Sequence, residues 1–186
     1  AFGSITGLGN LKFISRTTAS SSSSVSITSG IDSTYKEYIF FFNNIHPQTH
    51  NQKFTFNFSI DGGSNYNVTK TTSAFRAYQP EDASATSLSY RTGDDLAQST
   101  DYQGLTGSVG DDNDSSCSGF LHLFDPSNTT FVKHFISNVQ NMIGNASSRE
   151  DFIAGYGNTT SAINAIDFKF ASGNIDSGTI DLYGVN

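Results

Sequence analysis

The chain has no tryptophan, one cysteine and one methionine, and only 15% of its 186 residues are charged. A single cysteine, Cys117, excludes an internal disulfide. No apolar run approaches the ~20 residues of a membrane-spanning helix, and no basic segment followed by an apolar one indicates a signal peptide. Ten Lys and Arg against seventeen Asp and Glu give a net charge of −7. This acidic balance argues against nucleic acid or a membrane as a partner.

Sixteen phenylalanines and eight tyrosines supply the bulk of a core, and Ser, Thr, Asn and Gly carry most of the polarity. Aromatic and β-branched residues favour strands over helices. At this length the chain is expected to form one domain. We therefore expect a single all-β domain over residues 11–186, preceded by a glycine-rich arm over residues 1–10.

Strict alternation marks two parts of the core. In residues 53–60 the pattern places Phe54, Phe56, Phe58 and Ile60 inward, with Thr55, Asn57 and Ser59 outward. The turn residues 61–64 then predict a hairpin with residues 65–70. Near the C-terminus the same period recurs, and the residues predicted to be buried there are Ile166, Phe168, Phe170, Ile180 and Leu182.

Residues 117–124 and 130–137 flank the turn Asp125-Pro126-Ser127-Asn128 and predict a second hairpin. Residues 79–114 are irregular and read as a long surface loop, in which a short helix over 94–102 is conceivable. About ten short strands at this spacing predict an antiparallel β-sandwich of jelly-roll type.

Two features indicate contacts with other chains. The N-terminal arm carries Phe2, Ile5 and Leu8 on a glycine-rich backbone, which suits docking on a partner, although most termini simply fray. Residues 39–42 (Ile-Phe-Phe-Phe) are apolar on both faces of a predicted strand, as expected for a sandwich with a subunit contact. We expect a homo-oligomer, with a trimer favoured.

Residues that could carry chemistry give weak signals. His46 and His50 are separated by Pro47, so they are not expected on a helix that would present both to one metal. His122 and His134 lie on the two arms of the second predicted hairpin and could face one another. Cys117 begins a predicted strand and is expected to be a buried thiol.

The loop at residues 110–115 brings together Asp111, Asp112 and Asp114, which would suit a hard cation but lack the spacing of a calcium loop. A solvated acidic loop is the favoured interpretation, and the sequence leaves the cation question open. No pattern requires a cofactor or an enzyme. The irregular segment and its flanks offer Tyr78, Tyr90 and Tyr102 as candidate contacts with glycans or subunits.

Three segments, SGIDSTYKEY at 29–38, SIDGGSNY at 59–66 and ASGNIDSGTI at 171–180, give the chain a family resemblance. The chain resembles small virion-associated structural proteins of tailed bacteriophages, notably those of marine bacteria, from about residue 11 to 185. These motifs mark strands and turns rather than a reaction centre.

The resemblance implies a non-enzymatic virion protein, made in the host bacterial cytoplasm and displayed on the particle as a capsid decoration, tail component or fibre. Other virion proteins would then be its partners. Whether it belongs to the head or the tail is left open by these motifs. The alternative is a lectin-like, carbohydrate-binding module that recognises host-surface glycans, for which the absence of tryptophan is unfavourable.

Overall fold

The computed structural model describes residues 10–144 and 146–186, which form twelve β-strands and no helix. The predicted docking residues Phe2, Ile5 and Leu8 lie outside the described residues. The strands are β1 (Leu11–Ser22), β2 (Val25–Ile27), β3 (Glu37–Pro47), β4 (Gln52–Ser59), β5 (Lys70–Pro80), β6 (Ser87–Tyr90), β7 (Gln103–Val109), β8 (Cys117–Phe124), β9 (Lys133–Ile143), β10 (Ser147–Gly157), β11 (Ala165–Phe170) and β12 (Ile175–Val185).

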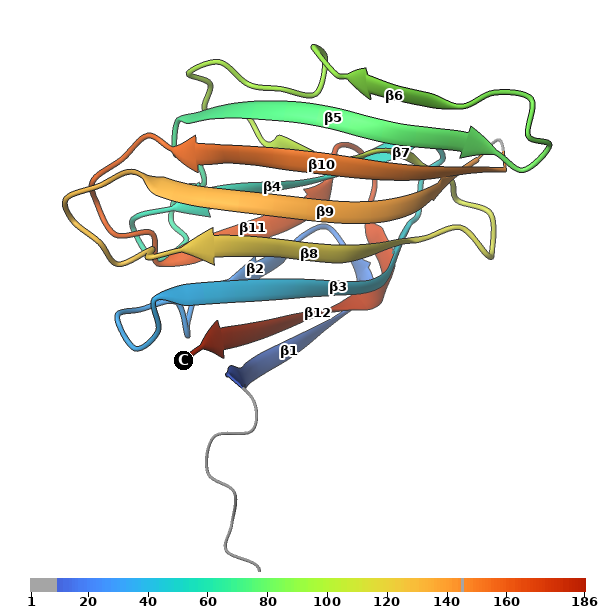
Figure 1. Cartoon of the computed structure of the whole chain (residues 1–186). Coiled ribbons are helices and arrows are strands. Elements are labelled where there is room, and N and C mark those ends of the chain that lie inside the picture. Colours follow the sequence, from blue (N-terminus) through green and yellow to red (C-terminus); the bar gives the residue numbers. More distant parts are fainter. Residues whose placement is uncertain (1–9, 145) are drawn as a thin grey trace, which may run out of the picture.

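The strands form two antiparallel sheets, one of eight strands in the order β1-β12-β3-β8-β9-β10-β5-β6 and one of four in the order β2-β11-β4-β7 (Figure 1). Eight of the strands make four pairs nested in the sequence: β1 with β12, β2 with β11, β3 with β8 and β4 with β7. A ribbon of nested antiparallel pairs wrapped into two facing sheets is a jelly roll. The predicted sandwich of jelly-roll type is therefore confirmed.

The chain leaves this ribbon twice, and both excursions widen the larger sheet. Strands β5 and β6 follow β4, and β9 and β10 follow β8; together they continue the sheet beyond β8. The smaller sheet stays four strands wide. Residues 91–102 connect the two sheets beside β5. Their backbone forms hydrogen bonds with residues of β5, and the chain then enters β7 of the smaller sheet.

The aromatic core lies between the two sheets. The predicted core residues Phe54, Phe56, Phe58, Ile166, Phe168 and Phe170 are each at most 2% exposed, as are Ile180 and Leu182. Strand β3 contributes Phe40 and Phe42 from the opposite sheet, and the rings of Phe42 and Phe54 meet edge to face at 5.2 Å. Each buried Phe contributes roughly 1.5–3 kcal/mol through area removed from water.

Several local expectations were wrong. Thr55, Asn57 and Ser59 point away from the aromatic core as expected but are at most 5% exposed. Residues 79–114 are not one long surface loop, because they contain β6 and the largely buried β7. Ile60 follows the end of β4 and is 42% exposed rather than buried. The turn at 61–64 does not make a hairpin, because β4 pairs with β11 and β7 in the smaller sheet, whereas β5 pairs with β10 and β6 in the larger one. Residues 94–102 contain no helix. The second predicted hairpin is confirmed, since β8 and β9 are antiparallel neighbours.

Candidate interaction surface

The outward face of the eight-stranded sheet is unusually apolar. Successive side chains of a strand point to opposite faces, and in β3 the buried Phe40 and Phe42 alternate with the partly exposed Ile39 and Phe41. The two-sided apolar run of residues 39–42 therefore places two of its residues on the outside of the sandwich. We define the outer aromatic face as the outward side chains Phe13, Ile39, Phe41, Phe75, Phe120, Phe124, Ile136, Phe152, Tyr156 and Tyr183.

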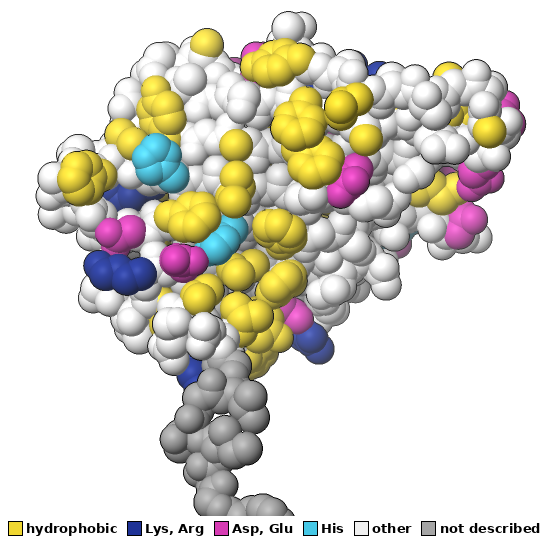
Figure 2. Space-filling model, in the orientation of Figure 1, with side chains coloured by type: hydrophobic (Ala, Val, Ile, Leu, Met, Phe, Trp, Pro, Cys, Tyr) yellow, Lys and Arg dark blue, Asp and Glu magenta, His cyan; other side chains and the backbone are white. Residues whose placement is uncertain are grey.

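Exposure of large apolar side chains is concentrated on this side of the molecule. Among the described residues eight large hydrophobic side chains are exposed, and six of them are outward on the eight-stranded sheet: Leu11, Phe13, Phe75, Leu88, Tyr90 and Ile136. Figure 2 shows hydrophobic side chains spread across this side with few charges between them. Contiguous exposed apolar patches in soluble proteins commonly mark binding surfaces.

The aromatic rings on this face contact one another across neighbouring strands. Phe75 on β5 and Phe152 on β10 are register partners and stack with ring centroids 4.6 Å apart and planes 7° apart. At the other end of the sheet the Tyr183 ring meets Phe13 on one side and Phe41 on the other, at 5.5 Å and 5.6 Å. These contacts fix the rings against one another across neighbouring strands.

Between the rings the face is hollowed. Small side chains at Ser73 and Ala154 leave a depression of about 330 Å³ bounded by Phe75, Phe120 and Phe152. A second depression, of about 520 Å³, continues from the same small residues towards β8 and β9. Ile136 borders both. The two depressions form one groove across β5, β10, β9 and β8.

Two pairs of ionisable groups lie on this face, whereas Glu150 on β10 makes no ion pair with a described residue. His122 Nε2 lies 2.8 Å from Glu37 Oε2, and Arg16 makes two contacts of 2.6 and 2.7 Å with the buried carboxylate of Asp181. His122 and His134 are not opposite each other, because His122 is opposite Ile136 in the register and the ring of His134 contacts Tyr156.

Sequence reasoning found this face only in part. The run at 39–42 predicted part of it, but Phe75 and Phe152 were missed because the inward positions of their strands are largely polar or small. Ile136 was missed because its neighbours on the same face of β9, His134 and Asn138, are polar. A signal was present in β10, where Phe152, Ala154 and Tyr156 are spaced by two and therefore share one face of the strand, opposite to the face that is buried.

A buried charge cluster lies on the other side of β10. Asp151 accepts hydrogen bonds from Arg149 Nε at 2.9 Å and Nη2 at 2.6 Å, and from the backbone N–H of Gly107 at 2.8 Å. Asp94 contacts Arg149 Nη2 at 3.3 Å and Arg91 Nε at 3.0 Å, and also binds the Lys53 ammonium.

Burial raises the pKa of Asp151 despite Arg149. Burial also opposes ionisation of Asp94, but hydrogen bonds from Lys53 and Arg91 outweigh it and lower the pKa of Asp94. Each carboxylate is thus held by cations of this cluster. The cluster links β10 to β7, to β4 and to residues 91–94, because Asp151 binds Gly107 and Asp94 binds Lys53, Arg91 and Arg149.

The three candidate tyrosines do not form one site. Tyr102 covers the smaller sheet, where its hydroxyl donates to Asp167 at 3.0 Å and the Lys169 ammonium lies 4.0 Å from its ring centre. Tyr90 is 56% exposed on β6 and donates to Asp95 at 2.8 Å. Tyr78 lies on β5 with the Arg76 guanidinium over its ring.

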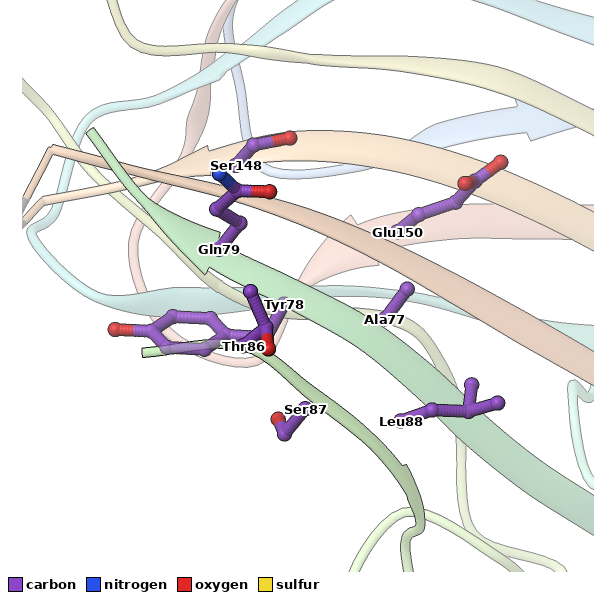
Figure 3. Close-up of a pocket in the computed structure, with 8 residues that line it drawn as sticks. All are labelled: Ala77, Tyr78, Gln79, Thr86, Ser87, Leu88, Ser148 and Glu150. Carbon is purple, nitrogen blue, oxygen red and sulfur yellow. The ribbon is translucent and has the colours of Figure 1, made fainter. Parts of the chain in front are cut away.

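A polar hollow lies beside Tyr78. It measures about 490 Å³ between β5, β6 and β10. Gln79 and Ser148 are register partners, and Figure 3 shows their side chains next to each other, with Glu150 further along β10. Ala77 and Leu88 add apolar surface.

The remaining candidates are separated. His46 Nδ1 lies 2.6 Å from the Ser115 carbonyl oxygen, and His50 Nδ1 lies 2.5 Å from Asp111 Oδ1. Within residues 10–144 and 146–186 no three His, Cys, Asp or Glu side chains are grouped so that they could hold a metal; Asp111, Asp112 and Asp114 therefore make no such group. Cys117 is buried, as expected, and burial raises the pKa of its thiol.

Comparisons with models of known protein families, with curated protein sequences and with solved structures found no match. In the part of the chain that the structure describes, no helix is long and apolar enough to cross a membrane.

Proposed function

We propose that this protein is a non-enzymatic structural component of a bacteriophage particle, and that it assembles through the outer aromatic face against further copies of the same chain. The observation that carries the proposal is the concentration of exposed apolar side chains on one sheet face. The resemblance of the segments at 29–38, 59–66 and 171–180 to virion-associated proteins supports the location. Jelly rolls also build viral capsids, which supports it by analogy only.

The size of the face is in keeping with a subunit interface. Eight strands spaced about 4.8 Å apart make it about 34 Å wide, and three rows of outward residues about 7 Å apart cover roughly 20 Å along the strands. The resulting ~700 Å² is close to the ~800 Å² that each partner buries in a standard interface. A second copy presents the same apolar surface, on which Arg16 is paired with Asp181 and His122 with Glu37 inside each chain, so association leaves these groups with their partners.

The test uses two matched substitutions in the full chain. Ile136 is 45% exposed in the middle of the face, and Ile60 is 42% exposed outside it. We expect light scattering to show an oligomer for the wild type and for Ile60→Glu, and a monomer for Ile136→Glu. A wild-type monomer at every accessible concentration contradicts assembly through this face.

The virion location needs its own experiment. Labelling the protein and imaging intact particles should show it on the head or the tail. Its absence from purified particles would remove the virion proposal and leave the assembly surface to be explained differently.

A second candidate function is glycan binding in the polar hollow beside Tyr78. Sugar sites combine an apolar surface with a few placed hydrogen-bonding groups, and Leu88 with Gln79, Ser148 and Glu150 offers both. Saturable binding of host-surface polysaccharide that is lost in Glu150→Ala and kept in Asp176→Ala would support it. Tyr102 is not suited to this role, because its hydroxyl and ring are already occupied.

A further inference from the structure

Lys70 is a lysine in the protein interior without an acidic partner. It begins β5, is 0% exposed, and its Nζ lies 2.5 Å from Asn57 Oδ1 and 2.8 Å from the Val68 carbonyl oxygen. Among the described residues no carboxylate is within ion-pair distance of this amine; Asp101 acts on it only through its charge. A charged ammonium is therefore costly here.

Burial accordingly lowers the pKa of Lys70 to about 7. At neutral pH much of the side chain is then the neutral amine, which has a free lone pair. A neutral lysine amine in an apolar setting is a nucleophile.

The amide next to this amine is held in one orientation. Asn57 is 0% exposed in β4, and its Nδ2 donates to the carbonyl oxygens of Tyr66 at 2.8 Å and Thr100 at 2.9 Å. Its Oδ1 accepts from the backbone N–H of Phe58 at 2.9 Å. Because Nδ2 has two acceptors beside it and Oδ1 has two donors, the Phe58 N–H and Lys70 Nζ, the amide has a single orientation that satisfies all four hydrogen bonds. The Phe58 N–H would also stabilise negative charge that develops on Oδ1, as the donors of an oxyanion hole do.

We propose that Lys70 and Asn57 join in an intramolecular isopeptide bond. Lys70 Nζ attacks Cγ of Asn57, the bond from Cγ to Nδ2 breaks, and a proton given up by Nζ goes to Nδ2, which leaves as ammonia. An amine and a primary amide thus become a secondary amide and ammonia. No oxidant, reductant or other reactant is consumed.

The bond would join the two sheets, because Asn57 lies in the four-stranded sheet and Lys70 in the eight-stranded one. It would close the chain at the point where the β5–β6 excursion leaves the jelly roll. A chain with one cysteine cannot place a disulfide there. The inference does not depend on the proposed function.

The chain provides a matched control in Lys133. This lysine is also 0% exposed and begins β9. Gly157 of β10 is the register partner of both lysines, of Lys133 on β9 and of Lys70 on β5. Its Nζ donates only to backbone carbonyls, those of Phe131 at 2.7 Å and Thr159 at 3.2 Å. Among residues 10–144 and 146–186 no side-chain amide lies within hydrogen-bond distance of the Lys133 amine.

Tryptic digestion of the denatured full chain, followed by mass spectrometry, decides the matter. Trypsin cleaves after Lys53 and Arg76 and, unless its amine is acylated, after Lys70. We expect a peptide of residues 54–76, lighter than its sequence mass by one ammonia, about 17 Da, while cleavage after Lys133 proceeds. Peptides 54–70 and 71–76 at full mass would overturn the proposal.

Two variants assign the partners. Asn57→Ala should restore cleavage after Lys70, and because the digest uses denatured protein this result can be read whether or not the variant folds. Lys133→Met should keep the mass deficit in residues 54–76. A deficit that survives in Asn57→Ala would overturn the assignment to Asn57.

Discussion

The rings of Phe75 and Phe152 stack face to face on the outside of the sandwich, 4.6 Å apart, with planes 7° from parallel. Phe75 remains 43% exposed in this arrangement. An aromatic pair at a surface contributes little to folding compared with a ring in the core. The pair would therefore contribute more to the free energy of binding, if a partner covered it, than it contributes to the free energy of folding.

The first prediction contrasts this surface ring with a core ring. Phe75→Ala should lower the free energy of unfolding by about 0.5–1.5 kcal/mol, the range for a lost aromatic pair. Phe56→Ala should cost about 3–5 kcal/mol, because Phe56 is 0% exposed and its removal leaves a cavity. Urea unfolding of the monomeric Ile136→Glu background would measure both. Equal costs would contradict the assignment of Phe75 to the surface.

The second prediction concerns the glycine beneath the buried charge cluster. A Cβ added at Gly107 would lie 1.8 Å from Arg149 Nη1, whereas a Cβ at Gly93 would meet nothing within 4 Å. Gly107→Ala should therefore cost about 1–3 kcal/mol or more through overpacking. Gly93→Ala should change the free energy of unfolding by no more than about 1 kcal/mol. Thermal unfolding of the two variants side by side is the measurement, and a neutral Gly107→Ala would contradict the packing of Arg149.

The sequence predicted those parts of the fold that depend on local alternation. Phe54 to Phe58 and Ile166 to Phe170 are buried because each second residue is aromatic or aliphatic, and a strand places such residues on one face. The hairpin predicted at residues 61–64 was wrong because turn residues indicate that the chain reverses but do not determine which strand the next one pairs with. The partner of Phe58 in the ladder is Ile166, more than a hundred residues away.

The candidate sites were harder to predict, since each depends on side chains brought together by distant strands. Nothing in the sequence near Lys70 distinguishes it from a solvated lysine, and Asn57 looked like an outward polar residue. The two are brought together by distant segments, since Asn57 donates to the carbonyl oxygens of Tyr66 and Thr100 and accepts from Lys70. The outer aromatic face likewise emerges from single residues on neighbouring strands rather than from one motif.

The third prediction compares two arginine–aspartate pairs. Arg149 is 4% exposed and holds Asp151, whereas the Arg16 side chain is 57% exposed and holds Asp181. Arg149→Met should cost about 3–5 kcal/mol, because it leaves a buried carboxylate without its cation. Arg16→Met should cost less than Arg149→Met, because solvent reaches this pair through the exposed Arg16 side chain, although the Asp181 carboxylate, 5% exposed, also loses its cation. Chemical denaturation would report both values, and a larger loss for Arg16→Met would contradict the greater contribution of the buried Arg149 cluster to stability.

The fourth prediction concerns acid stability at the turn after β4. Asp61 accepts hydrogen bonds from Ser59 Oγ at 2.7 Å, from Asn65 Nδ2 at 2.7 Å and from the Asn65 backbone N–H at 2.9 Å. These bonds, with that from Ser59 first, lower the pKa of Asp61 from 3.8 to about 2.

Because the folded-state pKa is below the unfolded value, the unfolded chain binds more protons between pH 2 and 4. The contribution of Asp61 to stability is therefore fully present above about pH 4 and is lost as the pH falls through about 2. Titration of the Asp61 carboxyl carbon by NMR should give a midpoint near 2, and Asn65→Ala should raise it towards 3.8 by removing the amide donor. A wild-type midpoint close to 3.8 would mean that the turn is not held by this carboxylate.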